Sequence, residues 1–422
     1  MPARPLRRLV GVLVCSACLL LPQAASSTPG AESRRGEPGS GPATWGAGRA
    51  GSNTDRTTAT SGIRWSDVPH TLWARTAIDF VGGANDWMRD RKAAADGTYA
   101  FEPDRLESRK LFARALFRAF GSMLQQDPGL SFPDLPASDP FYPYANVSVT
   151  AGWMQVDGAG AFRPSDPVTT REVHRALVLA IGMGDLAAGA DALHLRDGTP
   201  IATPKDFGTL LIGMRIGLRY NHRDESLDVG PDDPLPRGEV AWSLFRAATA
   251  PPWIRESLSG YATMTLPNLT KKMQAVVGFA VGYVGYPYVW GGEWYQGAPS
   301  GYCCGSQPVG GFDCSGVIWW AMKQAVDGWD NTPPRGYAGW SLPQRTSASM
   351  ASVGRKIHWD EIRPGDLLFY DGNDNGTVDH VDMYVGNGWA IDSGGSNAGV
   401  TFTYVSGTWY QDHFVHGRRV IG

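Results

Sequence analysis

Residues 309–320 read VGGFDCSGVIWW and place a cysteine, Cys314, between a glycine-rich stretch and an apolar run. The apolar run predicts a helix that begins beside Cys314. The N–H groups and the positive dipole end of a helix N-terminus stabilise a thiolate. Cys314 is therefore a candidate nucleophile. A buried structural cysteine and a disulfide to Cys303 or Cys304 are the alternatives.

The segments on either side of Cys314 predict an α+β domain over 271–422. Residues 271–285 (KKMQAVVGFAVGYVG) predict one helix, and the run after Cys314 predicts another. Four short apolar segments then predict strands, at 366–370, 380–386, 388–394 and 413–421. Helices followed by consecutive strands with hairpin-like turns indicate an antiparallel sheet.

A thiolate nucleophile also needs a base and a group that orients the base. His380 opens one of the predicted strands, and Asp392 follows after the turn GNG at 386–388. A hairpin at this turn would place the two residues side by side on adjacent strands. We therefore expect His380 and Asp392 to act together with Cys314.

The segment DGNDNGTVDHVD (371–382) has the spacing of a calcium loop. Oxygen-bearing side chains occupy places 1, 3, 5, 9 and 12, which are Asp371, Asn373, Asn375, Asp379 and Asp382. An Asx-rich hairpin turn is the alternative, and strand alternation would aim Asp382 to the same face as His380. Any calcium here would be structural, because the Cys–His chemistry requires no metal.

The N-terminal 62 residues predict export followed by a linker. A basic start, a short apolar run and small residues near Ala25 are typical of a signal peptide over 1–25, and 26–62 is rich in Gly, Ser, Thr, Ala and Pro. The mature chain is therefore expected to be secreted, with no transmembrane segment. A formal charge of −3 gives no electrostatic reason for nucleic-acid binding.

Residues 63–250 contain a diverged repeat, with copies at about 63–124, 130–184 and 185–250. Each copy has a proline after an extended apolar segment and then an arginine that opens a predicted helix. The prolines are Pro103, Pro164 and Pro231, and the arginines are Arg109, Arg171 and Arg237. Two helices in each long repeat predict an array of helical units that share interfaces. Residues 251–270 are expected to form a connector.

These repeats, and FRPSDPVTTREV (162–173) above all, resemble S-layer homology (SLH) domains, which bind anionic secondary polymers of cell walls. The resemblance implies an all-α three-repeat module in which Arg109, Arg171 and Arg237 recognise the polymer. Guanidinium groups suit carboxylate and phosphate ligands. The alternatives are that each arginine caps or pairs locally, or that the repeats only dock the catalytic domain.

Five ordered motifs in 271–422 resemble NlpC/P60 cysteine peptidases, a papain-like family that cuts peptidoglycan stem peptides. The motifs are GYPYVWGG, GFDCSG, LPQRTSA, IRPGDLLFY and DHVDMYVGNGWAID. The resemblance implies that Cys314 is the nucleophile, His380 the base and Asp392 the orienting residue, where the family more often has His. It further implies that Tyr288 lies beside the nucleophile and that Asp313 and Ser315 hold the free amine of the substrate's L-Ala.

The combined reading is a secreted, wall-associated hydrolase that cleaves the D-glutamyl–diamino acid amide of peptidoglycan. An amidase or acyltransferase of the same fold, and a catalytically inactive wall-binding protein, are the alternatives. The stretch 293–311 is longer than expected for the family. Its Cys303 and Cys304 could form a vicinal disulfide, remain thiols, or pair with Cys314.

Overall fold

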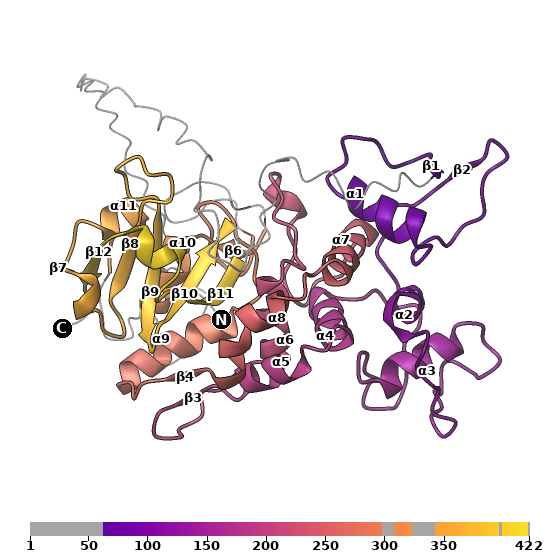
Figure 1. Ribbon diagram of the computed structural model, residues 1–422, viewed down its shortest axis with the longest axis horizontal. Helices are drawn as coiled ribbons and strands as arrows, with labels where there is room; N and C mark the ends of the chain where they lie inside the picture. Colours follow the sequence, from indigo (N-terminus) through magenta and orange to yellow (C-terminus); the bar gives the residue numbers. More distant parts are fainter. Residues whose placement is uncertain (1–61, 298–306, 308, 323–341, 396–398, 421–422) are drawn as a thin grey trace, which may run out of the picture. The chain divides into compact units, whose positions relative to one another are not determined.

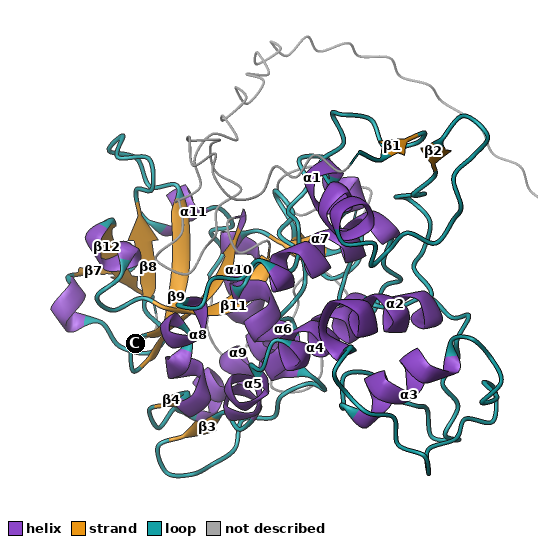
Figure 2. Cartoon of the chain, turned by 45° about the vertical axis from the view of Figure 1, so that its right-hand side comes forward, coloured by secondary structure: helices purple, strands orange, loops and turns teal. Residues whose placement is uncertain are grey.

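The computed structural model describes residues 62–297, 307, 309–322, 342–395 and 399–420. All of them belong to one compact unit, which spans 36–422. The predicted signal peptide, nearly all of the predicted linker, and Cys303 and Cys304 lie outside the described residues. Among the described residues, helices dominate from 62 to 282, and strands dominate after 355 (Figures 1 and 2).

The region before residue 250 is mainly helical. Its α-helices are α1 (Arg75–Ile78), α2 (Arg109–Leu116), α3 (Tyr142–Thr150), α4 (Thr170–Ala180), α5 (Gly184–Asp191), α6 (Phe207–Arg215) and α7 (Arg237–Ala248). It is not all-α as expected, because β1 (Arg64–Trp65) pairs with β2 (Thr98–Tyr99), and β3 (His194–Leu195) pairs with β4 (Thr265–Leu266). The predicted helix starts at Arg109 and Arg237 are the starts of α2 and α7.

Three extended segments, one ahead of each of α2, α4 and α7, bond to one another in a closed ring. The Glu107 N–H donates to the Leu235 carbonyl (3.0 Å), the Leu235 N–H to the Val168 carbonyl (2.8 Å), and the Val168 N–H to the Glu107 carbonyl (2.8 Å). The repeat units therefore meet at one junction. The three units do not form an open array in which only consecutive units touch, because the first and third units are also bonded to each other.

The predicted connector 251–270 is an integral part of this packing. It contains α8 (Ile254–Ser257) and the buried Tyr261, whose hydroxyl donates to the Phe402 carbonyl at 2.6 Å. The adjacent turn 259–263 packs against α5. The segment thus links the helical region to the sheet by direct contact.

The C-terminal region is α+β, as predicted. Six antiparallel strands lie in the order β11-β10-β9-β8-β12-β7. They are β7 (Arg355–Ile357), β8 (Leu367–Tyr370), β9 (His380–Gly386), β10 (Trp389–Gly394), β11 (Gly399–Tyr404) and β12 (Phe414–Arg419). Two helices, α9 (Lys271–Gly282) and α10 (Cys314–Met322), pack together, and α10 also contacts β9 and β10.

Helix α10 is buried along its whole length, because its apolar residues cover every face. A short hairpin, β5 (Glu293–Trp294) with β6 (Gly311–Phe312), leads directly into it. The remaining short helices are α11 (Ser347–Met350) and α12 (Trp409–Asp412). This arrangement holds the N-terminus of α10 beside the strands that carry His380 and Asp392.

Candidate active site

Cys314 is the first residue of α10, and a single residue separates it from strand β6. Its side chain is buried, with 7% of its surface exposed, and it carries a thiol rather than a disulfide. Tyr288 is also buried, and its backbone bridges to Phe312, two residues before Cys314. The sequence places the thiol at a helix N-terminus, where the backbone favours the thiolate.

His380 is the first residue of β9 and lies 2% exposed beneath the sheet surface. Strand β9 runs antiparallel to β10, and this hairpin brings the His380 ring to Asp392, with 3.0 Å between Nε2 and Oδ1. Cys314 interacts with the same imidazole, since it is among the groups that raise the pKa of His380. Nε2 faces the two carboxylates, and the buried Nδ1 has no hydrogen-bond partner within the described part of the chain.

A second carboxylate, Asp382, also contacts His380. Its Oδ1 lies 2.9 Å from Nε2, and the side chain is fully buried. Sequence reasoning assigned Asp382 to a calcium loop and missed this role. The available signal was strand alternation, since residues 380 and 382 share one face of β9.

The electrostatics of this cluster favour an imidazolium. Burial opposes protonation of the ring, but the charge of Asp382 and the hydrogen bonds that Asp382, Asp392 and Cys314 accept from it raise the pKa of His380 well above its usual value. Burial, and then the neighbouring charge of Asp392, raise the pKa of Asp382 to about 7. A charged imidazole beside a thiol stabilises the thiolate, which is the reactive form.

Two of the predicted calcium ligands, Asp371 and Asp379, accept hydrogen bonds within the loop, and calcium binding stays a prediction. Asp371 accepts the backbone N–H groups of Asn375 and Gly376, and Asp379 accepts from Gly372 and from the Asn373 amide. These are the bonds of an Asx-rich turn, which was the alternative interpretation. Asp382 is instead turned to His380.

Throughout the described ranges, one group of three or more His, Cys, Asp or Glu residues is close enough to hold a metal ion. It is His380, Asp382 and Asp392, whose ligand atoms lie within 4.8 Å of one another. The hydrogen bond of His380 to Asp392 and its ion-pair contact with Asp382 hold the imidazole in this cluster.

Asp313 and Ser315, the predicted amine ligands, are held by Arg345. The guanidinium donates to both carboxylate oxygens of Asp313 (3.0 and 3.1 Å), to the Ser315 hydroxyl (2.9 Å) and to Glu293 (2.8 Å). All four side chains are buried. This network braces the loop on both sides of Cys314, and the amine-binding role of Asp313 and Ser315 stays a prediction. Arg345, within the LPQRTSA motif, was missed as a site residue.

Each of the three repeat arginines bonds to a neighbouring repeat instead of pointing to solvent. Arg109 donates to the Phe162 carbonyl (2.7 Å) and pairs with Glu172, and Arg171 forms a two-point bond to Asp232 (2.6 and 2.9 Å). Arg237 of the third repeat returns to the first, donating to the Phe101 carbonyl at 2.8 Å.

Arg109 and Arg237 are 6% and 1% exposed. The prediction that these arginines recognise a wall polymer is therefore wrong for Arg109 and Arg237. The chemistry that suits a polymer carboxylate is satisfied by the protein's own carboxylates and carbonyls. Arg171, which is less buried, is occupied by Asp232 in the same way.

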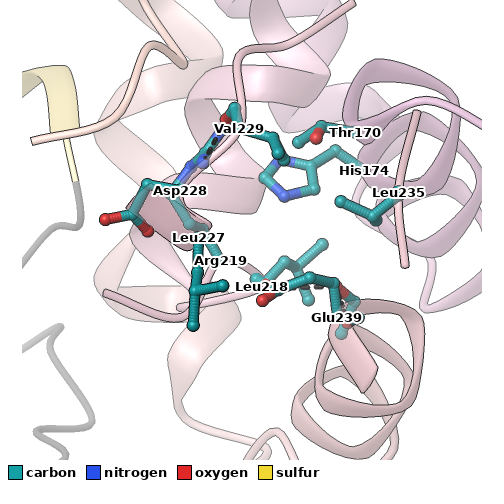
Figure 3. A pocket seen from close by; sticks show the side chains of 10 residues that line it. Thr170, His174, Leu218, Arg219, Leu227, Asp228, Val229, Leu235 and Glu239 are labelled. Atoms are coloured by element: carbon teal, nitrogen blue, oxygen red, sulfur yellow. Dashed lines mark hydrogen bonds between the residues drawn. The ribbon is translucent and has the colours of Figure 1, made fainter. Parts of the chain in front are cut away.

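A small cavity between α4 and α7 is shown in Figure 3. Its volume of about 10 Å³ has room for about one water molecule. His174 lines it, and burial together with the charge of Arg219 lowers the pKa of that imidazole to about 3. The cavity is a packing feature of the repeat core and is too small for a ligand.

In the described part of the chain, no helix combines the length and the apolar character needed to cross a bilayer.

Comparison with known proteins agrees with this geometry. Residues 285–419 match the NlpC/P60 family, and residues 131–171 match the S-layer homology domain. The murein DD-endopeptidase MepH of Escherichia coli (strain K12) is 34% identical over 140 residues, which is 33% of this chain and 42% of MepH. The bifunctional muramidase/DL-endopeptidase CwlT of Bacillus subtilis (strain 168) is 32% identical over 148 residues, 35% of this chain and 36% of CwlT.

The chain thus spans less than half the length of MepH and CwlT. The likeness to the peptidoglycan endopeptidase RipB of Mycobacterium tuberculosis (strain ATCC 25618 / H37Rv) is more extensive. It reaches 32% identity over 261 residues, 61% of this chain and 88% of RipB. With the buried Cys314 and His380 cluster in the matched region, the chain belongs to the NlpC/P60 family and carries an S-layer homology domain at 131–171.

Proposed function

We propose that this protein is a cysteine peptidase that hydrolyses an amide bond of peptidoglycan stem peptides. The observation that carries the proposal is a buried His380–Asp392 pair whose imidazole is electrostatically coupled to Cys314, the first residue of α10. The names of the relatives, endopeptidases of murein and peptidoglycan, support the same substrate class.

The proposed mechanism follows from the site. The Cys314 thiolate attacks the amide carbonyl, and the backbone N–H of Cys314 contributes to stabilising the oxyanion. The His380 imidazolium gives its proton to the leaving amine. Neutral His380 then takes a proton from water, which hydrolyses the thioester and restores the thiol. No step needs a metal ion.

For the scissile bond, we propose the amide between D-glutamate and the diamino acid. Two matching relatives from Bacillus subtilis carry the names DL-endopeptidase and gamma-DL-glutamyl hydrolase, which support this bond. We retain Asp313 and Ser315 as the proposed ligands of the substrate's free amine, because a carboxylate oxygen that accepts from Arg345 can accept a further hydrogen bond.

The test is mass spectrometry of the fragments that the full chain and Cys314→Ala release from purified peptidoglycan. Fragments that end at D-glutamate, absent with the variant, would establish the reaction and its nucleophile. Cleavage at another amide, or transfer to an added amine, would move the protein to the amidase or acyltransferase alternative. No release by either protein under reducing conditions would favour the inactive wall-binding alternative.

We further propose that the protein is exported and associates with the cell wall through its SLH region. The match at 131–171 supports wall association. Because Arg109 and Arg237 are internal, the binding surface on this proposal consists of other residues. Sedimentation of full-length Cys314→Ala with walls that retain or lack their secondary polymers tests it: binding that persists without the polymers would contradict polymer recognition.

A further inference from the structure

Helix α6 connects the helical region to the catalytic sheet. All nine of its residues are buried, because α4 and α5 cover it on the helical side and β11 contacts it on the other. The Phe207 ring at its start meets the Phe402 ring of β11 edge-on, with 6.2 Å between centroids. The helix therefore carries its last residue, Arg215, into the interior beside β11.

Arg215 is bonded to the catalytic sheet. Its Nη1 donates to the Thr403 hydroxyl at 3.1 Å, across 188 residues of sequence. The Thr403 hydroxyl in turn donates to Asp392 Oδ2 at 3.3 Å. The chain of bonds thus runs from the helical region to the carboxylate that orients His380.

Asp392 is held from two sides. Its Oδ1 faces His380, and its Oδ2 accepts from Thr403 and from the Tyr410 hydroxyl at 3.2 Å. Arg215 also hydrogen bonds to Tyr410, so the guanidinium contacts both donors of Oδ2. Such bonding fixes the rotamer of a carboxylate, as outer-shell partners do around other catalytic groups.

Arg215 adds a second cation beside the buried acidic groups. Two carboxylates, Asp382 and Asp392, lie against one imidazole, His380, and each is at most 2% exposed. Burial works against the charged form of Arg215, but its acidic and phenolic neighbours raise its pKa, so it remains a cation. The guanidinium therefore offsets part of the negative charge that these acidic groups and the Cys314 thiolate bring to a single imidazolium.

We propose that Arg215 is a positioning residue of the catalytic site, supplied by the helical region, and that it holds Asp392 through Thr403 and Tyr410. The helical region on this proposal is part of the catalytic apparatus and not only a wall anchor. The inference rests on the proposed function to the extent that Cys314 is taken as the nucleophile.

The groups that face Asp392 come from six elements. They are Arg215 (α6), Tyr261 (turn 259–263), Tyr370 (β8), His380 and Asp382 (β9), Thr403 (β11) and Tyr410 (α12). Loss of the Arg215 charge leaves the carboxylates in excess and loosens the hold on His380. Both effects disfavour the Cys314 thiolate.

The test is the rate at which iodoacetamide alkylates Cys314 in the full chain as a function of pH, followed on the Cys314 peptide by mass spectrometry. This readout needs no peptidoglycan, so it is independent of whether the proposed reaction occurs. The variants are Arg215→Met, Arg215→Lys and Thr403→Val. The matched control is Arg246→Met, another buried guanidinium of the helical region, which donates to the Ile216 carbonyl.

We expect Arg215→Met to move the alkylation midpoint to higher pH and to lower kcat/KM about 10- to 100-fold, because small misplacement of a catalytic group has costs of this order. Arg215→Lys should keep the midpoint and kcat/KM closer to those of the parent than Arg215→Met does. Thr403→Val should also move the midpoint to higher pH. Arg246→Met should leave the midpoint in place. Thermal unfolding verifies that each variant is folded.

An unchanged midpoint in folded Arg215→Met would overturn the proposal. If Arg215→Met does not fold, an unchanged midpoint in both Arg215→Lys and Thr403→Val would overturn it equally. An equal shift in Arg246→Met would also do so, since it would mean that any loss of packing in the helical region disturbs Cys314. Shifted alkylation without any peptidoglycan release would support this inference and refute the proposed function.

Discussion

The two carboxylates at His380 make a specific kinetic prediction. One Nε2–H lies within hydrogen-bond distance of Asp382 Oδ1 (2.9 Å) and Asp392 Oδ1 (3.0 Å). In Asp392→Asn, the amide can present its oxygen either to His380 or to the donors Thr403 and Tyr410, so one charge-assisted bond is lost. Such a bond contributes about 1.5–3 kcal/mol, and this predicts a fall in kcat/KM of about 10- to 150-fold.

Because Asp382 remains in place, Asp392→Asn should retain more activity than Cys314→Ala. Asp382→Asn should cost less than Asp392→Asn, because Asp382 already holds a proton part of the time with its pKa near 7. The double variant should fall by more than the product of the two single losses, since no carboxylate then orients His380.

The assay is release of soluble fragments from purified peptidoglycan at several substrate concentrations, with Asp374→Asn as the control. The Asp374 side chain is 84% exposed and stands outside the His380 cluster, so its variant should match the parent. A loss in Asp392→Asn as large as in Cys314→Ala, or strictly multiplicative losses in the double variant, would refute the idea that the two carboxylates share the imidazole.

Three other predictions concern stability. Arg345→Met leaves buried carboxylates such as Asp313 unpaired and should lower the free energy of unfolding by about 3–5 kcal/mol, measured in urea; a change below about 1 kcal/mol would contradict the bracing role. The pKa of His174 is about 3 in the folded protein and about 6.5 in the unfolded chain. The contribution of neutral His174 to the free energy of unfolding should therefore be lost as pH falls from about 6.5 to 3. His174→Gln should weaken that pH dependence, whereas exposed His358→Gln should not. Adding calcium or EDTA should leave the thermal midpoint unchanged, because 371–382 is a self-bonded turn; a rise with calcium would revive the metal site.

Local patterns predicted the parts of the site that depend on local geometry. The apolar run after Cys314 became α10, and the GNG turn became the hairpin that joins β9 to β10. Both predictions depend on neighbours within about a dozen residues, where turn chemistry and alternation act directly. The placement of His380 beside Asp392 follows from them.

The errors arose where a residue's chemistry suits several partners. A guanidinium binds a polymer carboxylate and a protein carboxylate by the same geometry, and Arg237 bonds to Glu107 at 2.5 Å in the core. Spacing alone likewise cannot distinguish a calcium loop from a turn whose backbone N–H groups occupy Asp371. Burial decides the case of Arg237, and burial is a property of the assembled fold.

The sequence by itself determined the division into a helical and an α+β region, the family of the latter, and the place of Cys314 at a helix start. Only the tertiary structure decided that Asp382 joins His380, that Arg345 holds Asp313, and that Arg215 reaches Thr403. Each of these contacts involves side chains whose partners are chosen by how elements pack. A pattern of residues along the chain records which faces are apolar, but it does not record which faces meet.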